Sequence, residues 1–586
     1  MTGTDVVYGS DLMAELLRSM GVRHAFINPG SSFRGLHDSI VNCLDDRDPK
    51  LVLTTHEMIA VSMAHGYAKA SGEPGVAILH NLVGLLNGSM GVFNAFCDQV
   101  PLLILGGSGP ADPAERRFID WAHCASTQPD IVRPFVKWAE EPATLQACLD
   151  AMLEARRRSV TAPRGPVYVS LDAGLQESPA DADVVLPDPS LPRFAAPAPS
   201  VPDPATLTRI AEVLAAARLP LIIGGRFGTD PATTAALAPL VELTGAAYLD
   251  DRNIVCMPTA HPQNMEGDGA IRGEADVILA LDCQDLTAAT LGYGSNRSAI
   301  LSGSGAVGRA APYIIDISRN DQFGGSWARF GGPTPPADLR VDADALASLG
   351  PLLAAVEAAM TEGRRVNSQA RIETLKARKA EVAARRRHRR EAGNNETVSL
   401  AKLTEALFAE VRGDDWLLAV RNHRSWQAGI WDFPGSGYYL GGDGGGGVGY
   451  GPGAVAGAAL ALKDSGKLVI GILGDGDFVM GGGALWSAAH TGAPMLIVIA
   501  NNRSWGNDEL HQIEVAQHRG RPVGNAHVGQ RMEDPPIDLL AMARSMGASG
   551  FGPATNPAEL AVALAEGAAA ARAGKVAVVE VMTAVE

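Results

Sequence analysis

Three blocks of the sequence alternate helical periodicity with short apolar runs, and this alternation limits the chain to a few folds. The first block, over 5–180, contains DLMAELLRSMG, HAFINPG, LVLTTHE, AVSMAHGYAKASG, GVAILH, PLLILGG and PVYVSLD. The second starts near 205 with LTRIAEVLAAA and LPLIIGG, and the third near Leu400 with LAKLTEALFAEV and WLLAV. Strands that alternate with helices pair in parallel. The sequence therefore predicts an α/β fold with three doubly wound parallel-sheet domains.

Composition marks the joints between these blocks. Seven prolines crowd the stretch from Pro187 to Pro204, which opposes both helix and central strand. The segment from Arg371 to Gly393 has a helix-forming composition and a basic run, Arg385–Arg390. That run is either an anion-binding patch or, as the acidic chain favours, the solvated face of a connector. We expect an N-terminal domain over 1–185, a Pro-rich linker over 186–204, a middle domain over 205–365, a basic helical connector over 366–395 and a C-terminal domain over 396–586.

Charge and cysteine usage exclude several classes of partner. Lys and Arg number 49 against 65 Asp and Glu, a net charge of −16 that repels nucleic acid and anionic membrane surfaces. The six cysteines include no CxxC pair, so neither a disulfide framework nor a zinc site is predicted. No stretch approaches 18 uninterrupted apolar residues, and the first residues lack the pattern of an export signal. We expect a cytoplasmic protein that binds neither nucleic acid nor membrane.

The sharpest chemical signal follows the apolar run KLVIGIL, where Gly474-Asp475-Gly476-Asp477-Phe478 begins. Glycines at the carboxyl end of a parallel strand let backbone N–H groups approach a phosphate. Asp475 supplies a carboxylate oxygen and Asn502, one strand–helix–strand repeat later, an amide oxygen, which suits Mg²⁺ shared with a diphosphate. A lone GDG is also a common tight turn, but GDG together with Asn501-Asn502 predicts a diphosphate site.

These motifs resemble the cofactor signature of thiamine diphosphate-dependent enzymes of the pyruvate oxidase and decarboxylase group. The resemblance covers essentially the whole chain and implies thiamine diphosphate and Mg²⁺ as cofactors. It implies that the N-terminal domain binds the pyrimidine and that the C-terminal domain binds the diphosphate and Mg²⁺. It implies that Asp475, Asn502 and the backbone carbonyl of Ser504 bind the metal. The implied cofactor-binding residues in this region are Gly474, Asp475, Gly476, Asp477, Phe478, Asn502, Ser504 and Trp505. Asp477 departs from the family pattern, because a second carboxylate repels a diphosphate unless it turns away or accepts backbone N–H bonds.

The resemblance extends to the pyrimidine end of the cofactor. Glu57, in THE before AVSMAHGYAKASG, matches the glutamate that hydrogen-bonds the pyrimidine ring nitrogen. In isolation it would be interpreted as a surface residue before a helix. In the glycine-rich run 441–449, the Gly446 carbonyl matches the acceptor for the aminopyrimidine nitrogen, and Val448 the apolar residue that bends the cofactor. Valine is smaller than the usual residue there.

Two motifs of the N-terminal block indicate the reaction. Asn28-Pro29-Gly30-Ser31 resembles the NPGS loop of benzoylformate decarboxylases, in which the serine contacts the substrate carboxylate. His80, after GVAIL, resembles their catalytic histidine, and a histidine titrates near neutrality as an acid or base should. A histidine at a strand end can equally be structural.

Other features depart from that pattern. LALDCQDLTAATLGYG lacks the second catalytic histidine of the decarboxylases, for which His423 is a substitute to consider. NNRSWGNDELH and the GDGDF variant are similar to carboligases, benzaldehyde lyase and acetolactate synthase-like proteins. PLIIGGRFG is not GxGxxG, so FAD is not expected.

Three functions remain open from the sequence. The first is a 2-oxo acid decarboxylase for aromatic or branched substrates with carboligase activity. The second is an acetolactate synthase-like carboligase, or a lyase that cleaves 2-hydroxyketones. The third, a non-catalytic cofactor-binding paralogue, is disfavoured because Glu57, Asp475 and Asn502 are intact. The resemblance implies a homodimer or homotetramer with active sites at the dimer interface.

Overall fold

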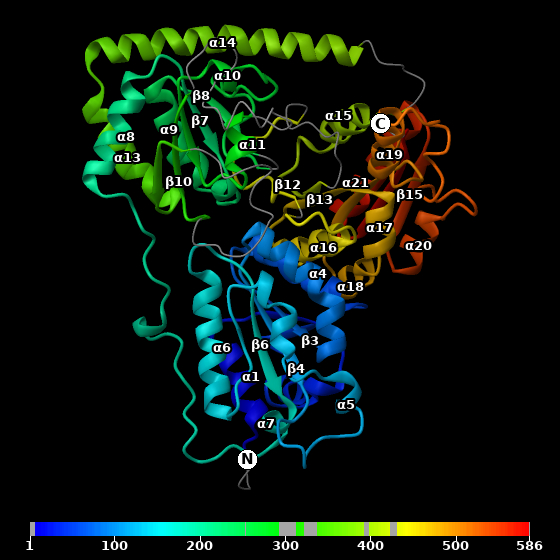
Figure 1. Ribbon diagram of the computed structural model, residues 1–586. Helices are drawn as coiled ribbons and strands as arrows, with labels where there is room; N and C mark the ends of the chain where they lie inside the picture. The colour runs from blue at the N-terminus through cyan, green and yellow to red at the C-terminus, as the bar shows by residue number, and fades with distance from the viewer. Residues whose placement is uncertain are drawn as a thin grey trace. The chain divides into compact units, whose positions relative to one another are not determined.

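The computed structural model describes residues 6–251, 254–291, 312–320, 337–391, 398–421, 431–442 and 444–584. It contains three parallel sheets with helices packed against them (Figure 1), which confirms the predicted α/β fold. The described residues divide into two compact units. The first unit draws on 1–197, 397–425 and 442–586, and the second on 198–396 and 426–441.

The first sheet belongs to the first unit and has the strand order β2-β1-β3-β4-β6-β5. Its strands are β1 (His24–Ile27), β2 (Lys50–Leu53), β3 (Gly75–Leu79), β4 (Leu102–Ser108), β5 (Ala139–Glu140) and β6 (Val167–Asp172). Its helices are α1 (Gly9–Ser19), α2 (Arg34–Asp38), α3 (Glu57–Ser71), α4 (Leu82–Asp98), α5 (Asp120–His123), α6 (Leu145–Val160) and α7 (Ala173–Glu177). Alternate strand residues such as Ile78 pack with α1 and α6, while Phe26 packs against Tyr67 of α3. Burial of both faces explains the nearly continuous apolar strands.

The third sheet, also in the first unit, has the order β12-β13-β14-β16-β15. Its strands are β12 (Trp416–Arg421), β13 (Leu468–Gly474), β14 (Met495–Asn501), β15 (Ser549–Ala554) and β16 (Val576–Met582). Its helices are α15 (Leu400–Val411), α16 (Tyr450–Leu462), α17 (Asp475–Gly481), α18 (Ala484–Thr491), α19 (Gly506–His518), α20 (Leu539–Ser545) and α21 (Pro557–Arg572). Gly474 pairs with Ala500 across β13 and β14, so the segments that follow these two strands leave the same edge of the sheet.

Helices α3 and α16 cross closely and join the two sheets of the first unit. A Cβ atom at Gly66 would lie 2.0 Å from the Ala454 carbonyl oxygen, and one at Gly457 would lie 1.9 Å from that of Met63. Only glycine tolerates these approaches between backbones. The helix that begins at Glu57 is therefore fixed against the helix that follows the glycine-rich run.

The second sheet lies in the second unit, with the order β11-β10-β9-β7-β8. Its strands are β7 (Pro220–Gly224), β8 (Ala247–Asp250), β9 (Val277–Leu281), β10 (Tyr313–Ser318) and β11 (Leu339–Asp342). Its helices are α8 (Pro204–Ala216), α9 (Thr233–Thr244), α10 (Ile271–Glu274), α11 (Leu286–Leu291), α13 (Ala345–Ala359) and α14 (Glu362–Glu391). The glycines of PLIIGGRFG are needed for packing, since a Cβ at Gly225 would lie 2.1 Å from the Asp282 carbonyl oxygen.

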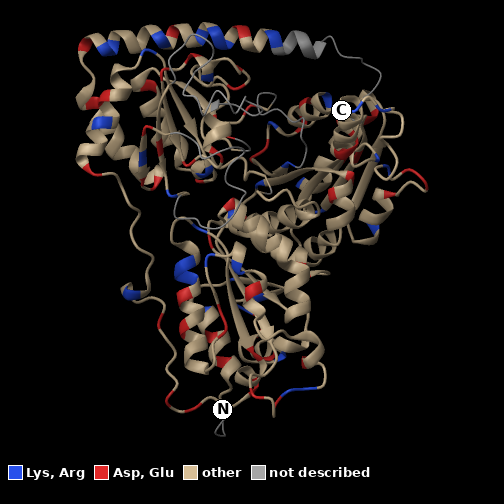
Figure 2. Cartoon of the chain, viewed as in Figure 1, with Lys and Arg blue, Asp and Glu red and all other residues tan. Residues whose placement is uncertain are grey.

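The basic helix α14 uses several of its cations within the second unit. Arg378 bonds Glu274 at 2.7 Å, and Lys379 donates to the backbone carbonyls of His261 and Asn264. Basic and acidic residues both occur along the helix, with basic residues in the majority (Figure 2). Arg385 is exposed, and the side chains of the remaining basic run lie outside the described residues. The connector interpretation thus remains a prediction.

No single helix in the described ranges is both long enough and apolar enough to cross a membrane. One pair of helices, Ala345–Ala359 and Glu362–Arg385, has the combined length and composition of a membrane span, but the pair is bent by 116° at the break between them.

Candidate active site

Asp475 lies at the first position of α17, directly after β13, and its carboxylate is only partly satisfied. The residue is 4% exposed, and Oδ1 accepts the backbone N–H of Gly476 at 3.0 Å. Oδ2 is buried and has no hydrogen-bond partner among the residues described. Burial raises the pKa of Asp475 to about 6, although nearby backbone N–H groups, including those of Arg503 and Ser504, oppose the shift. A buried carboxylate with a free oxygen is suited to a cation.

The turn after β14 faces the same edge of the sheet. Arg503 takes the left-handed backbone conformation, with φ of 54°, and the Asn502 Oδ1 accepts the Ser504 N–H at 2.9 Å. Ser504 Oγ donates to Glu509, which bonds Arg531 at 2.8 Å and so ties the turn to the following segment. Carboxylate, amide oxygen and backbone carbonyl are the ligand types that Mg²⁺ prefers. The residues proposed for the metal therefore lie on neighbouring strand ends and fit it chemically.

The backbone at the end of β13 has open space beside Gly474. A Cβ at Gly474 would meet nothing within 4 Å, whereas one at Gly476 would lie 2.7 Å from the Trp505 ring. Trp505 therefore covers Gly476, and Phe478 is fully buried in the core beneath. The described part of the chain holds no group of three His, Cys, Asp or Glu that could bind a metal. A metal at this edge would thus depend on the mixed oxygen donors.

Asp477 accepts backbone N–H bonds, which compensate the negative charge of its buried carboxylate. Its Oδ1 accepts the N–H groups of Gly449 at 2.6 Å and Gly451 at 3.3 Å. These groups lie at the start of α16, where the helix dipole favours a negative charge. Asp477 therefore anchors the end of the glycine-rich run to α17.

The glycine-rich run packs against α4 of the N-terminal part. Gly447 N–H faces Asn94 Oδ1 at 3.4 Å, and a Cβ at Gly447 would lie 2.3 Å from the Met90 Cε. Gly446 has a φ of +69° and open space on its Cβ side, while Val448 is 38% exposed. The two residues predicted to hold the pyrimidine end of the cofactor thus line open space.

A buried charge cluster fixes the beginning of this run. Lys69 bonds Asp98 and donates to the Gly442 carbonyl oxygen at 2.7 Å. His65 Nε2 lies 3.2 Å from Asp98 Oδ2, and the His65 ring packs 5.0 Å from that of Tyr450. Burial, with Lys69 next to it, lowers the pKa of His65 to about 4, although Asp98 opposes the shift.

This cluster predicts acid sensitivity of the fold. An unfolded His65 binds its proton near pH 6.5, but the folded residue does so only near pH 4, so lowering the pH across this window favours unfolding. The expected loss is about 3 kcal/mol, and calorimetric unfolding between pH 7 and pH 4 measures it. His65→Gln should make the free energy of unfolding less dependent on pH, whereas the exposed His37→Gln, the control, should not. An equally steep pH dependence in His65→Gln would show that His65 does not cause the acid sensitivity.

Glu57 is the first residue of α3 and is 7% exposed. Its Oε2 faces Asn87 Nδ2 at 3.3 Å. A Cβ at Gly84 would lie 3.2 Å from Oε1, so this glycine of α4 leaves room beside the carboxylate. Thr55, two residues before α3, packs against the junction of α17 and α18, because a Cβ at Gly483 would lie 2.2 Å from Thr55 Oγ1.

His80 follows β3 and is held by two neighbours. Its Nδ1 lies 2.8 Å from Ser32 Oγ, which also accepts the Asn81 N–H at 3.1 Å. A Cβ at Gly30 would lie 2.4 Å from His80 Cγ, so the glycine of NPGS leaves space for the ring. Burial lowers the pKa of His80, His123 and Arg117 lower it further, and Asp120 opposes them.

Ser31, the serine predicted to contact substrate, is exposed, and its carbonyl oxygen accepts a bond from Arg117 at 3.3 Å. Ser32, which the motif comparison missed, is the serine that meets His80. His123 was also missed, and its ring centroid lies 5.5 Å from that of His80. Neither carries a motif, because Ser32 lies in a single 3-10 turn and His123 ends the four-residue helix α5. His423 lies outside the described residues.

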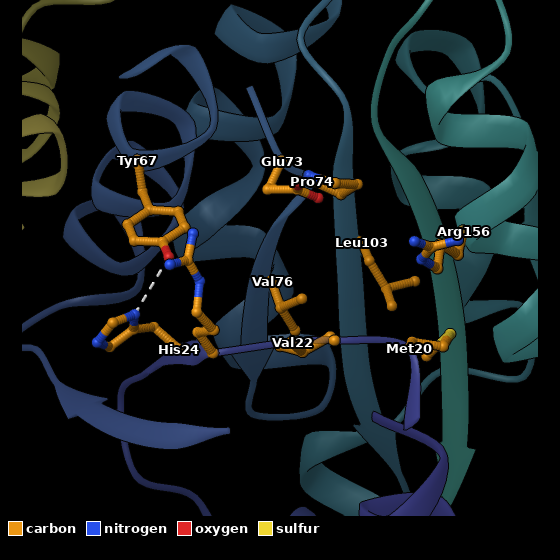
Figure 3. Close-up of a pocket in the computed structure, with 11 residues that line it drawn as sticks. Met20, Val22, His24, Tyr67, Glu73, Pro74, Val76, Leu103 and Arg156 are labelled. Atoms are coloured by element: carbon orange, nitrogen blue, oxygen red, sulfur yellow. Dashed lines mark hydrogen bonds between the residues drawn. The ribbon is translucent and has the colours of Figure 1, made fainter. Parts of the chain in front are cut away.

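A small cavity lies beside the starts of β1 and β3, at the opposite end of β3 from His80 (Figure 3). His24 and Tyr67 meet across it at 3.3 Å, and Arg156 closes another side. Its volume of about 20 Å³ is room for about one water molecule. None of its lining residues belongs to the candidate site, and the cavity is too small for a substrate.

Comparisons with known proteins agree with this arrangement. Residues 7–128 match the thiamine pyrophosphate enzyme, N-terminal TPP binding domain, and residues 420–581 match the corresponding C-terminal TPP binding domain. Benzoylformate decarboxylase of Pseudomonas aeruginosa is 28% identical over an alignment of 578 residues, which covers 95% of this chain and 96% of that protein. The chloroplastic acetolactate synthase 2 of Nicotiana tabacum is 25% identical over 548 residues, 89% of this chain and 76% of that protein.

A solved structure shares the fold. The thiamine diphosphate-dependent 4-hydroxybenzoylformate decarboxylase of Rhodococcus jostii superposes with a TM-score of 0.73 at 21% identity and covers 99% of both chains.

Proposed function

We propose that this chain, which belongs to the thiamine diphosphate-dependent enzymes of the decarboxylase and acetolactate synthase group, is a Mg²⁺-dependent 2-oxo acid decarboxylase with carboligase activity. The observation that carries the proposal is the position of His80 at the end of β3. Its ring meets Ser32, and it borders Gly84, which also lies beside the Glu57 carboxylate. The preferred substrates are aromatic or branched 2-oxo acids. Similarity to a benzoylformate decarboxylase over nearly the full length supports this choice.

The residues of the C-terminal part would hold the charged end of the cofactor. Asp475 offers its free Oδ2, and Asn502 and the Ser504 carbonyl complete an oxygen set for Mg²⁺. Gly474 leaves room for the diphosphate, and the Gly446 carbonyl and Val448 would contact the pyrimidine end. When bound, thiamine diphosphate supplies the electron sink that cleavage beside a carbonyl requires.

The residues of the N-terminal part would control protons. Glu57 would accept a hydrogen bond from the pyrimidine ring, in a position where the start of α3 favours its negative charge. His80 would give or take the proton at the reacting carbon, because an imidazole can change its protonation state near neutral pH. Ser31, exposed beside His80, would meet the substrate carboxylate.

Product analysis tests this function directly. The purified protein with Mg²⁺ and thiamine diphosphate is incubated with benzoylformate, pyruvate or benzoin, and the products are identified. Release of benzaldehyde and CO₂ from benzoylformate is the expected result. Formation of acetolactate from pyruvate, or cleavage of benzoin without any decarboxylation, would replace the decarboxylase assignment.

A second candidate is an acetolactate synthase-like carboligase or a lyase for 2-hydroxyketones. Similarity to acetolactate synthases over most of the chain favours it. In a carboligase the reacting carbon forms a carbon–carbon bond instead of taking a proton, so His80 would not be needed to protonate that carbon.

His80→Ala separates the two candidates. If His80 transfers a proton during decarboxylation, its removal should lower the rate by about 10² to 10⁴. Steady-state turnover of benzoylformate measures this, with exposed His37→Ala as the matched control. An unchanged decarboxylation rate would leave His80 a structural role only.

We further propose that the working protein is a homodimer or a pair of homodimers, in which Glu57 of one copy completes the diphosphate site of another. Inactive Glu57→Gln and Asp475→Ala chains, mixed under conditions that exchange subunits, should then recover part of the activity. One of the two sites in such a heterodimer would contain both intact residues. Demonstrated heterodimers without any recovery would indicate that each site is built within one chain.

A further inference from the structure

His123 ends the short helix α5 and is held in place by its surroundings. The next residue, Cys124, accepts the Gly109 N–H at 3.2 Å through its sulfur. At the start of the helix, Asp120 is buried and accepts the Arg117 N–H at 2.9 Å. The segment from 109 to 124 is therefore tied to the end of β4 and presents His123 to His80 from a fixed position.

The two histidine rings meet edge to face, with a centroid distance of 5.5 Å and an interplanar angle of 86°. The His123 Nδ1 is buried and has no hydrogen-bond partner among the described residues. On its other side, His80 is held at Nδ1 by Ser32 Oγ. A hydroxyl oxygen can accept two hydrogen bonds, so Ser32 Oγ can accept the His80 Nδ1–H beside the Asn81 N–H, and a neutral ring with its proton on Nδ1 has Nε2 free to accept another.

Several charged groups surround this pair. Arg117 and Asp120 face it from the same segment as His123, and Glu57 borders it from α3 across Gly84. Arg117 and Asp120 bond each other, so their charges partly cancel. His123 is then the titratable neighbour whose positive form lowers the pKa of His80.

We propose that His123 is a positioning residue for His80, and that the two rings form a coupled pair that carries at most one proton near neutral pH. A proton on His123 disfavours a second on His80, so His80 is kept neutral and ready to accept a proton at Nε2. Ser32 fixes the ring orientation for that transfer. The proposal rests on the proposed function for its use, but the coupling itself is a property of the free protein.

Histidine NMR titration of the protein without substrate or cofactor tests the coupling. In His123→Gln, the titration midpoint of His80 should rise by about 0.5 to 2 pH units, the range for a unit charge at about this distance between water and a protein surface. The exposed His37→Gln should leave the His80 midpoint unchanged. An unchanged His80 midpoint in folded His123→Gln would overturn the proposal.

A second variant supplies the measurement if His123→Gln does not fold. His123→Phe keeps an aromatic ring in the same place but removes the charge, so it should raise the His80 midpoint in the same way. Ser32→Ala should change the ¹⁵N shifts of the His80 ring, because Nδ1 loses its hydrogen-bond partner. An unchanged His80 midpoint in His123→Phe would contradict the coupled pair. Because none of these readouts needs turnover, failure of the decarboxylase assignment would be seen separately in the product analysis.

Discussion

Glu57→Gln is expected to lower turnover by about 10² to 10⁴ while the protein still folds and still binds thiamine diphosphate and Mg²⁺. The substitution preserves the shape of the side chain in the space left by Gly84, but it removes the negative charge at the start of α3. A neutral amide cannot stabilise a protonated pyrimidine nitrogen as a carboxylate does. The proposed proton chemistry of the cofactor would therefore fail while its binding persists.

Two measurements separate binding from proton chemistry in this variant. Titration calorimetry should give nearly normal cofactor affinity, whereas exchange of the cofactor C2 proton should slow with turnover. Glu73→Gln, an exposed glutamate just after the same helix, is the matched control. Near-normal C2 proton exchange in Glu57→Gln would show that the carboxylate has another role.

The part of the candidate site carried by regular strands was predictable from the sequence. KLVIGIL and PMLIVIA are apolar runs long enough for buried strands, and adjacent parallel strands bring the residues after them to one edge. Asp475 and Asn502 could therefore be placed together from spacing alone. The α/β fold with three sheets was predictable for the same reason.

The parts that depend on tertiary packing were not predictable. The sequence left two outcomes open for Asp477, because its N–H partners Gly449 and Gly451 belong to a different helix. Ser31 and Ser32 differ by one residue in a short turn, and only the geometry there shows which one meets His80. The hydrogen bond from Lys69, which also bonds Asp98, to the Gly442 carbonyl joins residues more than 300 positions apart. No local sequence pattern could predict such a contact.

Asp475→Asn is expected to abolish binding of both Mg²⁺ and thiamine diphosphate, and to make the cofactor-free protein more stable. Loss of binding follows because the free Oδ2 is the only carboxylate oxygen in the proposed metal set. Without the metal, the diphosphate charge near buried Asp477 is no longer screened. Titration calorimetry with Mg²⁺ and thiamine diphosphate should detect no heat of binding.

The gain in stability follows from the same burial. Because the pKa of Asp475 is raised to about 6 in the folded protein, the ionised carboxylate at pH 7 opposes folding, and this penalty fades as the pH falls through that value. Replacing it with a neutral amide should therefore raise the free energy of unfolding by about 1 to 3 kcal/mol at pH 7. The exposed Asp464→Asn should change neither binding nor stability. Weaker cofactor binding together with a higher free energy of unfolding is what we expect of a buried carboxylate that binds a cation and destabilises the cofactor-free fold. Unchanged calorimetric binding in Asp475→Asn would show that Asp475 is not a metal ligand.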